Sequence, residues 1–399
     1  MLVFPNKNSL MTMKILLALD FQPDKDINGV VTSVLTLQEE LARRGHEIRI
    51  LTLGSVGSKW GENGIYRLPS INASFVSPGV RFRPTAASQA KLKELLEWGP
   101  DIVHANTETS TYPTATKISK RLNIPLVVTA HTCWQDLISY LHLPKVIEQR
   151  YLRFRLNSMY SKCDALIAPS KKQCDILQGY NHTCPIEIIP TGIDTSRFAP
   201  TISDAGKNTL RMKLGLPTNA VLGLYVGRIA PEKSCDLLLR YASKAELPHT
   251  ALAFVGDGPK LEELKKEALR LGLSDKVFFT GAVPHENAAD YYAIADFFMS
   301  ASRTETQGLT YIEAQASGLP LLCRADACLD RIVRQGENGY VFHNEEEFLQ
   351  GFEALVASRP SREEVRASFN PSFTKEHFAE SVEDLYIRVI EAKRKKSPF

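Results

Sequence analysis

The chain has 399 residues, of which 44% are hydrophobic and 23% charged, and its formal net charge is +3. This length predicts two domains rather than one, and the composition is that of a globular protein, which argues against a disordered or fibrous chain. No apolar run reaches the roughly 18 residues that span a bilayer, and the seven cysteines show neither a C-x-x-C pair nor metal-ligand spacing, which favours isolated reduced thiols over a disulfide framework.

The first 13 residues are polar and patternless, and we expect a disordered arm there, or a start of translation at Met13. A helix pattern over residues 30–44 follows the first apolar run and ends at Gly45. The strand-like runs of the first half are residues 15–19, 48–51, 102–104, 126–129 and 165–168.

Pro190 and Gly192 interrupt the pattern, and a polar stretch leads to a second series of strand-like runs. These runs are residues 221–226, 251–255, 277–279, 297–299 and 321–323. Strands that alternate with helices predict an α/β fold of two Rossmann-like domains, each with a parallel sheet. The expected division is residues 14–195, residues 196–373 and a C-terminal helix over residues 374–399.

Two carboxylates eight positions apart mark the most informative segment of the chain, residues 302–320. Glu305 lies in a polar loop, and Gly308 follows where the pattern predicts a helix start. Such a helix directs its unpaired N–H groups and its positive dipole end into the loop, which suits a diphosphate. Glu313 lies about 7–8 Å further along the helix axis. The pair suits a nucleotide sugar, although two unrelated surface carboxylates would give the same pattern.

Further candidate residues follow predicted strands, at the sheet edge where open α/β sheets bind ligands. Arg228 and Lys233 come after residues 221–226 and can neutralise a diphosphate, while Gly256 allows close backbone approach to a ligand. In the first half, Gly29 begins a helix after the first strand, and His131 follows residues 126–129, where it can bond a sugar hydroxyl or stabilise developing charge.

The run from Glu305 to Ala314, Glu-Thr-Gln-Gly-Leu-Thr-Tyr-Ile-Glu-Ala, resembles the signature of the retaining family 4 glycosyltransferases. The amino acids of this run, and Gly-Val-Val-Thr-Ser-Val at residues 29–34, look most like the corresponding segments of the bacterial diacylglycerol glucosyltransferases. The resemblance covers nearly all of residues 13–390. It implies a GT-B fold, in which the first domain serves the acceptor, the second binds a UDP-sugar, and the terminal helix crosses back to the first domain.

By resemblance, His131, Arg228, Lys233 and Glu305 are catalytic, with His131 and Glu305 facing the donor hexose. The implied donor-binding residues are Gly29, Gly256, Val283, Gln307, Gly308, Leu309 and Glu313, of which Val283 holds the base through its backbone. This chain has Asn28-Gly29 where the family usually has two glycines. The resemblance implies neither a cofactor nor a metal, and the one D-x-D match, residues 24–26, is interpreted as a solvated loop.

The acceptor side is indicated by a basic, aromatic-bearing helix pattern near residues 141–162. Residues 145–172 contain seven basic and two acidic side chains, and residues 1–200 hold 23 Lys and Arg against 17 Asp and Glu. Such a segment is typical of a membrane-surface or lipid-headgroup element, although a solvated helix face has the same composition. The residues proposed for membrane and acceptor are Trp134, Asp136, Arg150, Tyr151, Arg153, Phe154 and Arg155.

The leading hypothesis is therefore a retaining enzyme that moves a hexose, glucose from UDP-glucose, to diacylglycerol or a related glycolipid. It would lie peripherally on the cytoplasmic face of the cell membrane, next to anionic lipid, with no role in nucleic-acid binding. The alternatives are the same donor chemistry with a soluble or cell-wall polymer acceptor, a non-catalytic nucleotide-sugar binding protein, and an epimerase or phosphorylase of the same fold.

Overall fold

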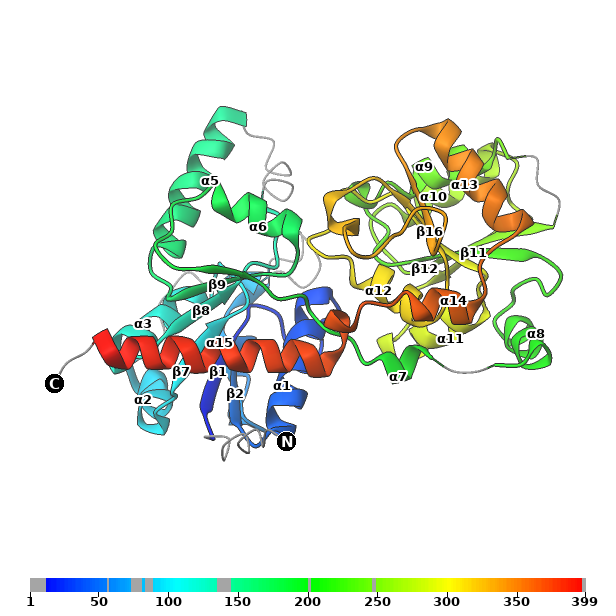
Figure 1. Cartoon of the computed structure of the whole chain (residues 1–399). Helices are drawn as coiled ribbons and strands as arrows, with labels where there is room; N and C mark the ends of the chain where they lie inside the picture. Colours follow the sequence, from blue (N-terminus) through cyan, green and yellow to red (C-terminus); the bar gives the residue numbers. More distant parts are fainter. Residues whose placement is uncertain are drawn as a thin grey trace, which may run out of the picture. The chain divides into compact units, whose positions relative to one another are not determined.

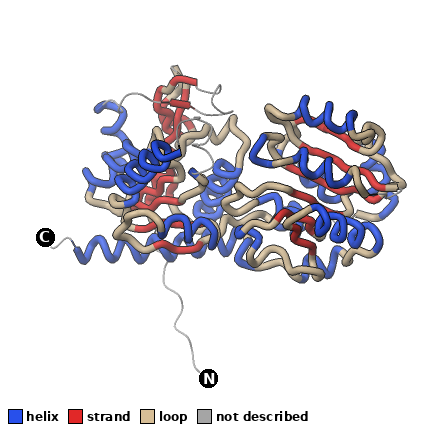
Figure 2. Tube along the Cα trace, turned by 90° about the horizontal axis from the view of Figure 1, so that it is seen from above, coloured by secondary structure: helices blue, strands red, loops and turns tan. Residues whose placement is uncertain are grey.

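The computed structural model describes residues 12–55, 57–72, 81–82, 89–134, 145–199, 202–245 and 249–396. Two compact units make up the chain, and in each of them helices flank strands (Figure 2). Ile193–Thr374 form the second unit, and the first combines the described residues up to Gly192 with those from Lys375 onward. Among the described residues, no helix has both the length and the apolarity that a bilayer crossing requires.

In the described part of the first unit, an eight-stranded sheet has the order β10-β9-β8-β7-β1-β2-β4-β3. Neighbouring strands are parallel except for β3 and β4. The central strands are fully buried, as is usual when helices cover both faces of a parallel sheet. The strands are β1 (Lys14–Ala18), β2 (Glu47–Gly54), β3 (Trp60–Glu62), β4 (Ile65–Pro69), β7 (Ile102–Ala105), β8 (Leu126–Thr129), β9 (Ala165–Ala168) and β10 (Ile186–Ile188), with a separate pair, β5 (Ile71–Asn72) and β6 (Arg81–Phe82).

The helices of the first unit include the last helix of the chain, which packs beside the first (Figure 1). They are α1 (Gly29–Arg43), α2 (Gln89–Trp98), α3 (Tyr112–Leu122), α5 (Lys145–Tyr160), α6 (Lys171–Gln178) and α15 (Lys375–Lys396). Glu383 of α15 bonds Arg44 and His46, each at 2.9 Å, and Tyr386 bonds His104 at 2.6 Å. The predicted return of the C-terminal helix to the first domain is therefore confirmed.

The N-terminal boundary of the first unit differs from the expected arm of residues 1–13. Met13 is only 2% exposed, and its backbone N–H donates to Nδ1 of His46 at 3.2 Å. Its carbonyl accepts from the N–H of Glu47 at the start of β2. Met13 therefore belongs to the packed unit.

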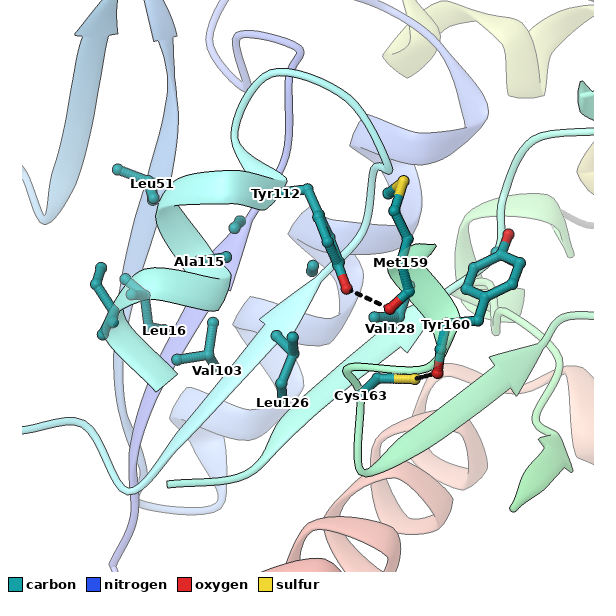
Figure 3. Packing of buried hydrophobic residues seen from close by; sticks show 14 of the residues in the cluster. Leu16, Leu51, Val103, Tyr112, Ala115, Leu126, Val128, Met159, Tyr160 and Cys163 are labelled. Carbon is teal, nitrogen blue, oxygen red and sulfur yellow. Dashed lines mark hydrogen bonds between the residues drawn. The ribbon is translucent and has the colours of Figure 1, made fainter. Parts of the chain in front are cut away.

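A buried stripe attaches α5 to the rest of the first unit. The Tyr112 hydroxyl on α3 donates to the carbonyl of Met159 at 2.7 Å, and the Cys163 thiol donates to the carbonyl of Tyr160 (Figure 3). Leu152 and Leu156 are buried on the same stripe. Because only this stripe packs inward, the opposite face of α5 is exposed.

In the described part of the second unit, six parallel strands have the order β13-β12-β11-β14-β15-β16. They are β11 (Val221–Val226), β12 (Thr250–Val255), β13 (Val277–Gly281), β14 (Phe297–Ser300), β15 (Leu321–Arg324) and β16 (Gly339–Phe342). The order reverses between β11 and β14, and doubly wound sheets bind ligands beyond the carboxyl ends of the strands at such a point. In the first sheet, β1 and β7 are the corresponding neighbours.

The helices of the second unit cover both faces of its sheet. The α-helices are α7 (Thr195–Phe198), α8 (Asp204–Lys213), α9 (Cys235–Ala242), α10 (Leu261–Arg270), α11 (Ala288–Ile294), α12 (Leu309–Ala316), α13 (Glu345–Ala357) and α14 (Arg362–Ala367). Short 3₁₀ turns lie at Pro231–Lys233, His285–Asn287, Ala327–Leu329 and Pro371–Phe373.

Glycine allows the loops after β11 and β12 to touch. A Cβ at Gly256 would lie 1.9 Å from the carbonyl oxygen of Gly227, far inside any contact distance. The same loops are joined by hydrogen bonds, from the N–H of Gly227 to Val255 and from the N–H of Ile229 to Asp257, both at 2.9 Å. The neighbouring backbone therefore requires glycine at position 256.

We expect Gly256→Ala to lower the free energy of unfolding by about 2–4 kcal/mol, because backbone strain and a backbone clash add. Gly272→Ala is the matched control: Gly272 also has a positive φ, +70°, but no heavy atom lies within 4 Å of its Cβ position. The control should lose about 1 kcal/mol. The three tryptophans lie in the first unit, at residues 60, 98 and 134, so unfolding should be followed by circular dichroism. Equal losses in the two variants would contradict the loop packing.

Candidate functional site

The loops after β11 and β14 meet where the strand order of the second sheet reverses. The Lys233 ammonium forms an ion pair with the Glu305 carboxylate, and both side chains are about one-fifth exposed. The Thr304 hydroxyl also lies 3.5 Å from the carbonyl of Glu232. Two of the predicted catalytic residues, 72 positions apart, are thus brought into contact by the adjacency of β11 and β14.

The charge state of Lys233 follows from its surroundings. Burial acts to lower the pKa of this ammonium, but the carboxylates of Glu305 and Glu232 outweigh burial, and the pKa is raised above its ordinary value. Lys233 is therefore charged at neutral pH. A charged ammonium beside a carboxylate can donate to phosphate oxygens, while the carboxylate accepts from sugar hydroxyls.

Arg228 has a fixed backbone and an accessible side chain. Its carbonyl accepts from the buried Tyr225 hydroxyl at 2.9 Å. Its guanidinium lies 3.9 Å from Glu232, and its side chain is 39% exposed. This arrangement keeps the guanidinium at the same sheet edge as Lys233, where it remains accessible to an anionic ligand.

The start of α12 lies at the same edge and carries no side-chain cap. Gly308 is its N-cap with φ +80°, and a Cβ there would lie 2.4 Å from the Tyr311 ring. The Tyr311 hydroxyl is itself held by Ser300 at 2.9 Å. Gly308 has no side chain with which to cap the helix, and the backbone N–H groups at a helix start attract anions.

The remaining predicted donor-binding residues of the second unit differ in what they expose. Glu313 is 4% exposed and accepts from the Tyr292 hydroxyl at 2.8 Å, and Gln307 is also 4% exposed. The side chains of Val283 and Leu309 pack against the hydrophobic core. A ligand would therefore meet the backbone of these two residues rather than their side chains.

In the first unit, the carboxyl ends of β7 and β8 bring His131 close to Asn106. The Nε2 atom of His131 lies 3.4 Å from Oδ1 of Asn106. Burial lowers the pKa of His131 to about 4, so this imidazole is neutral at pH 7. Of the two roles predicted for it, hydrogen bonding to a hydroxyl fits a neutral ring better than stabilisation of charge.

Gly29 is the first residue of α1, and its surroundings differ from those of Gly308. The side chain of Asn28 accepts from the N–H of Val31 at 3.0 Å and so caps the helix. One of the first N–H groups of α1 is therefore already bonded. The start of α12 is similar in this respect, because the N–H of Tyr311 is bonded to the carbonyl of Gly308 at 3.1 Å.

The predicted membrane and acceptor residues separate into three groups. Trp134 packs against the hydrophobic core of the first unit, and Asp136 lies outside the described residues. The α5 residues are exposed: Arg150, Arg153 and Arg155 together with Tyr151 at 54% and Phe154 at 73%.

Two further apolar residues, which are not among the predicted membrane residues, extend the exposed part of α5. Val146 is 76% exposed and Ile147 is 56% exposed. Val146, Arg150 and Phe154 are spaced four residues apart and so lie on one helix face, with Ile147 and Tyr151 beside them. We call these five residues the α5 surface.

Sequence reasoning also missed two residues that hold parts of these sites in place. Asp20, two residues after β1, accepts from the N–H groups of Ser110 at 2.9 Å and Thr111 at 2.7 Å, and so fixes the loop after β7. Its position at a strand end is a signal that could have identified it. Tyr292, which bonds Glu313, has no such signal, because it is buried on α11.

The described residues contain no group of three or more His, Cys, Asp or Glu side chains placed to hold a metal ion. The two carboxylates of the D-x-D match at residues 24–26 have protein partners. Asp24 pairs with Arg67 of β4 at 3.0 Å, and Asp26 accepts from the N–H of Gln22 at 2.6 Å.

Sequence comparisons match both halves of the chain. Residues 27–197 match the profile described as Glycosyltransferase Family 4, and residues 206–368 match Glycosyl transferases group 1. The alpha-monoglucosyldiacylglycerol synthase of Streptococcus pneumoniae is 31% identical over 369 residues, covering 91% of this chain and 83% of that protein. The protein of the same name from Acholeplasma laidlawii is 32% identical over 392 residues, covering 93% and 96%.

Solved structures of the same fold cover almost the whole chain. Sucrose-phosphate synthase from Thermosynechococcus elongatus superposes with a TM-score of 0.73 at 21% identity, covering 95% of this chain and 100% of that one. HepE of Anabaena, solved with UDP and glucose, has a TM-score of 0.69 at 20% identity, covering 94% and 100%. Two Rossmann-like units of the GT-B type, the matched profiles and the two relatives agree: this chain belongs to glycosyltransferase family 4, a family of retaining enzymes.

Proposed function

We propose that this chain transfers glucose from UDP-glucose to diacylglycerol or a related glycolipid at the cytoplasmic face of a membrane, without a metal ion. The observation that carries the donor half is the Lys233–Glu305 pair at the β11–β14 reversal, beside the uncapped start of α12. The two synthases at 31% and 32% identity, named for monoglucosyldiacylglycerol, support the acceptor half.

In the proposed donor complex, the diphosphate displaces Glu305 from part of the Lys233 ammonium. Arg228, Lys233 and the first N–H groups of α12 then neutralise the phosphate oxygens, while Glu305 accepts from hydroxyls of the hexose. Glu313, held by Tyr292, accepts from the ribose. These groups are placed to stabilise the negative charge that develops as the nucleoside diphosphate leaves. Such electrostatic stabilisation lowers the activation free energy of the transfer.

Retention follows if departure and attack occur on the same face of the sugar. The bond between the anomeric carbon and the phosphate oxygen breaks first, and its electron pair stays on the diphosphate. The acceptor hydroxyl then attacks the anomeric carbon from that face and gives its proton to the departed phosphate oxygen. Neutral His131 orients a hexose hydroxyl by hydrogen bonding.

The α5 surface is the proposed contact with an anionic bilayer. Tyr151, Phe154, Val146 and Ile147 present apolar groups to solvent, and Arg150, Arg153 and Arg155 surround them with positive charge. Aromatic and aliphatic side chains enter the interfacial region of a bilayer, while arginines bind anionic headgroups. A lipid acceptor would then reach the enzyme without leaving the membrane.

The test compares acceptors in one assay of nucleotide release from UDP-glucose. UDP-glucose is combined with liposomes that contain diacylglycerol and anionic lipid, with the same liposomes lacking diacylglycerol, or with soluble saccharides. Release that requires diacylglycerol supports the proposal. Release that requires a soluble saccharide would instead assign a soluble acceptor, and no release under any of these conditions would favour a non-catalytic binding protein.

The two carboxylates of the donor site should separate in their effects. Glu313→Gln should weaken UDP binding about tenfold, because a carboxylate that accepts from a ribose contributes about 1.5 kcal/mol or more. Glu305→Gln should leave UDP binding nearly unchanged and reduce turnover, because its proposed partner is the hexose, which UDP lacks. Calorimetric titration with UDP distinguishes them, and an equal loss of affinity in both variants would contradict these roles.

A further inference from the structure

A second polar pocket lies at the opposite edge of the second sheet from the donor site. It has a volume of about 370 Å³ and is lined by Lys207, Asp296, Arg359 and Arg362, with Gly318, Pro320 and Ser361 among its other walls. Asp296 directly precedes β14, and Pro320 directly precedes β15, so the pocket lies at the amino-terminal ends of these strands. Neither the predicted site residues nor the proposed function accounts for it.

The positive charge of this pocket exceeds its negative charge. Asp296 pairs with Lys207 at 2.6 Å, with Arg211 at 2.8 Å and with Arg359 at 3.3 Å, so one carboxylate is shared among three cations. Arg362 is a fourth cation, and its guanidinium donates to the carbonyls of residues 292, 293, 295 and 317. The nearby carboxylate of Glu364 is engaged with the N–H and hydroxyl of Ser361.

Burial and the neighbouring cations both act on Arg362. Burial, with the neighbouring cations Arg366, Arg211 and Arg359, lowers the pKa of Arg362 to about 10, against the opposing attraction of Asp296. Clustered cations destabilise one another in a partly desolvated place unless an anion joins them.

The cations of the pocket divide into two kinds. Arg211 is 3% exposed, and its guanidinium is occupied by Asp296 and by the carbonyls of Ile294, Pro217 and Ala220. Arg211 and Arg362 therefore join helix ends and loops of the fold. Arg359 is exposed, with one hydrogen bond at 3.3 Å, and the Lys207 side chain is 20% exposed. The Arg359 and Lys207 side chains can therefore reorient toward a ligand while Asp296 stays paired with Arg211.

We propose that this pocket binds a small phosphate-bearing ligand, held by Arg359 and Lys207 with Arg362 behind them. A phosphate accepts charge-assisted hydrogen bonds from arginine and lysine. Its negative charge would balance the positive charge that Asp296 alone does not neutralise. The ligand is a free phosphate ester or the headgroup of a phospholipid, which share this chemistry.

The experiment is calorimetric titration of the whole chain at fixed ionic strength, with chloride as the reference anion. Inorganic phosphate and glycerol 3-phosphate probe a soluble ligand, and dihexanoylphosphatidylglycerol below its micellar concentration probes a headgroup. We expect binding of at least one probe beyond the chloride reference. Arg359→Gln and Lys207→Gln should each weaken it about tenfold or more, whereas Arg240→Gln, which removes an exposed arginine paired with Asp236 on α9, should change it less than twofold.

The donor site also attracts phosphate, so its contribution must be separated. Arg228→Gln should retain the response if the anion binds at the far edge of the sheet. Loss of binding in Arg228→Gln, with retention in Arg359→Gln and Lys207→Gln, would assign the anion to the donor site and overturn the proposal. Binding no stronger than that of chloride with all three probes would overturn it as well.

Discussion

Arg228→Ala and Lys233→Ala should each reduce turnover by about 100-fold or more, because each removes a cation aimed at the departing diphosphate. The structure makes the two losses differ in kind. Lys233 forms an ion pair with Glu305, so its removal also takes a counter-charge from the carboxylate that is proposed to bind the hexose. The Arg228 guanidinium lies 3.9 Å from Glu232, so its removal chiefly takes positive charge from the phosphate.

Steady-state measurement of UDP release checks both variants, with circular dichroism to show that they fold. Arg240→Ala is the matched control, because Arg240 lies on the helix that follows Lys233 and pairs only locally with Asp236 at 2.9 Å. The control should keep its turnover within about twofold, as is usual for surface substitutions away from a site. Near-normal turnover in folded Arg228→Ala or Lys233→Ala would contradict the proposed role of that cation in neutralising the diphosphate.

Charge reversal on α5 should weaken the binding of anionic liposomes more than tenfold. Each basic residue close to such a surface contributes roughly 1 kcal/mol, and Arg150→Glu with Arg153→Glu replaces two attractions by two repulsions. The difference should shrink as salt rises, because exposed charges are screened over about 8–10 Å at 0.1–0.15 M. UDP-glucose hydrolysis in detergent should survive, since most proposed donor residues belong to the second unit.

Liposome flotation at two salt concentrations measures this effect. Lys265→Glu with Lys266→Glu provides the same change in net charge on exposed residues of α10 in the second unit, and it should alter binding far less. Phe154→Ser should also weaken binding, but without the salt dependence, since it removes an apolar contact. Unchanged binding in the arginine double variant would leave α5 as a solvated helix face and favour a soluble acceptor.

The sequence predicted the central strands of both sheets because buried parallel strands are nearly continuous apolar runs. The strands it missed have weaker patterns. β3 has only three residues and lies at a sheet edge, and β4 alternates between buried and half-exposed positions. β16 begins at Gly339, where a Cβ would lie 2.3 Å from the carbonyl oxygen of Leu321. The structure pairs this strand with β15 in parallel.

The candidate site was predictable residue by residue but not as a set of contacts. Polar residues after strands indicated Lys233 and Glu305 separately, whereas their pairing depends on β11 lying next to β14. The need for Gly256 arises from the backbone of the adjacent loop rather than from a ligand. The cap on α1 was accessible from the sequence, because Asn three residues before Val31 is an N-cap signal.

The most direct test of the account is a crystal structure of this chain with UDP bound. We expect the diphosphate beyond the carboxyl ends of β11 and β14, with its oxygens bonded to Lys233, Arg228 and the first N–H groups of α12, and the ribose on Glu313. UDP bound elsewhere, with Lys233 still paired to Glu305 and no ligand at the start of α12, would contradict the account.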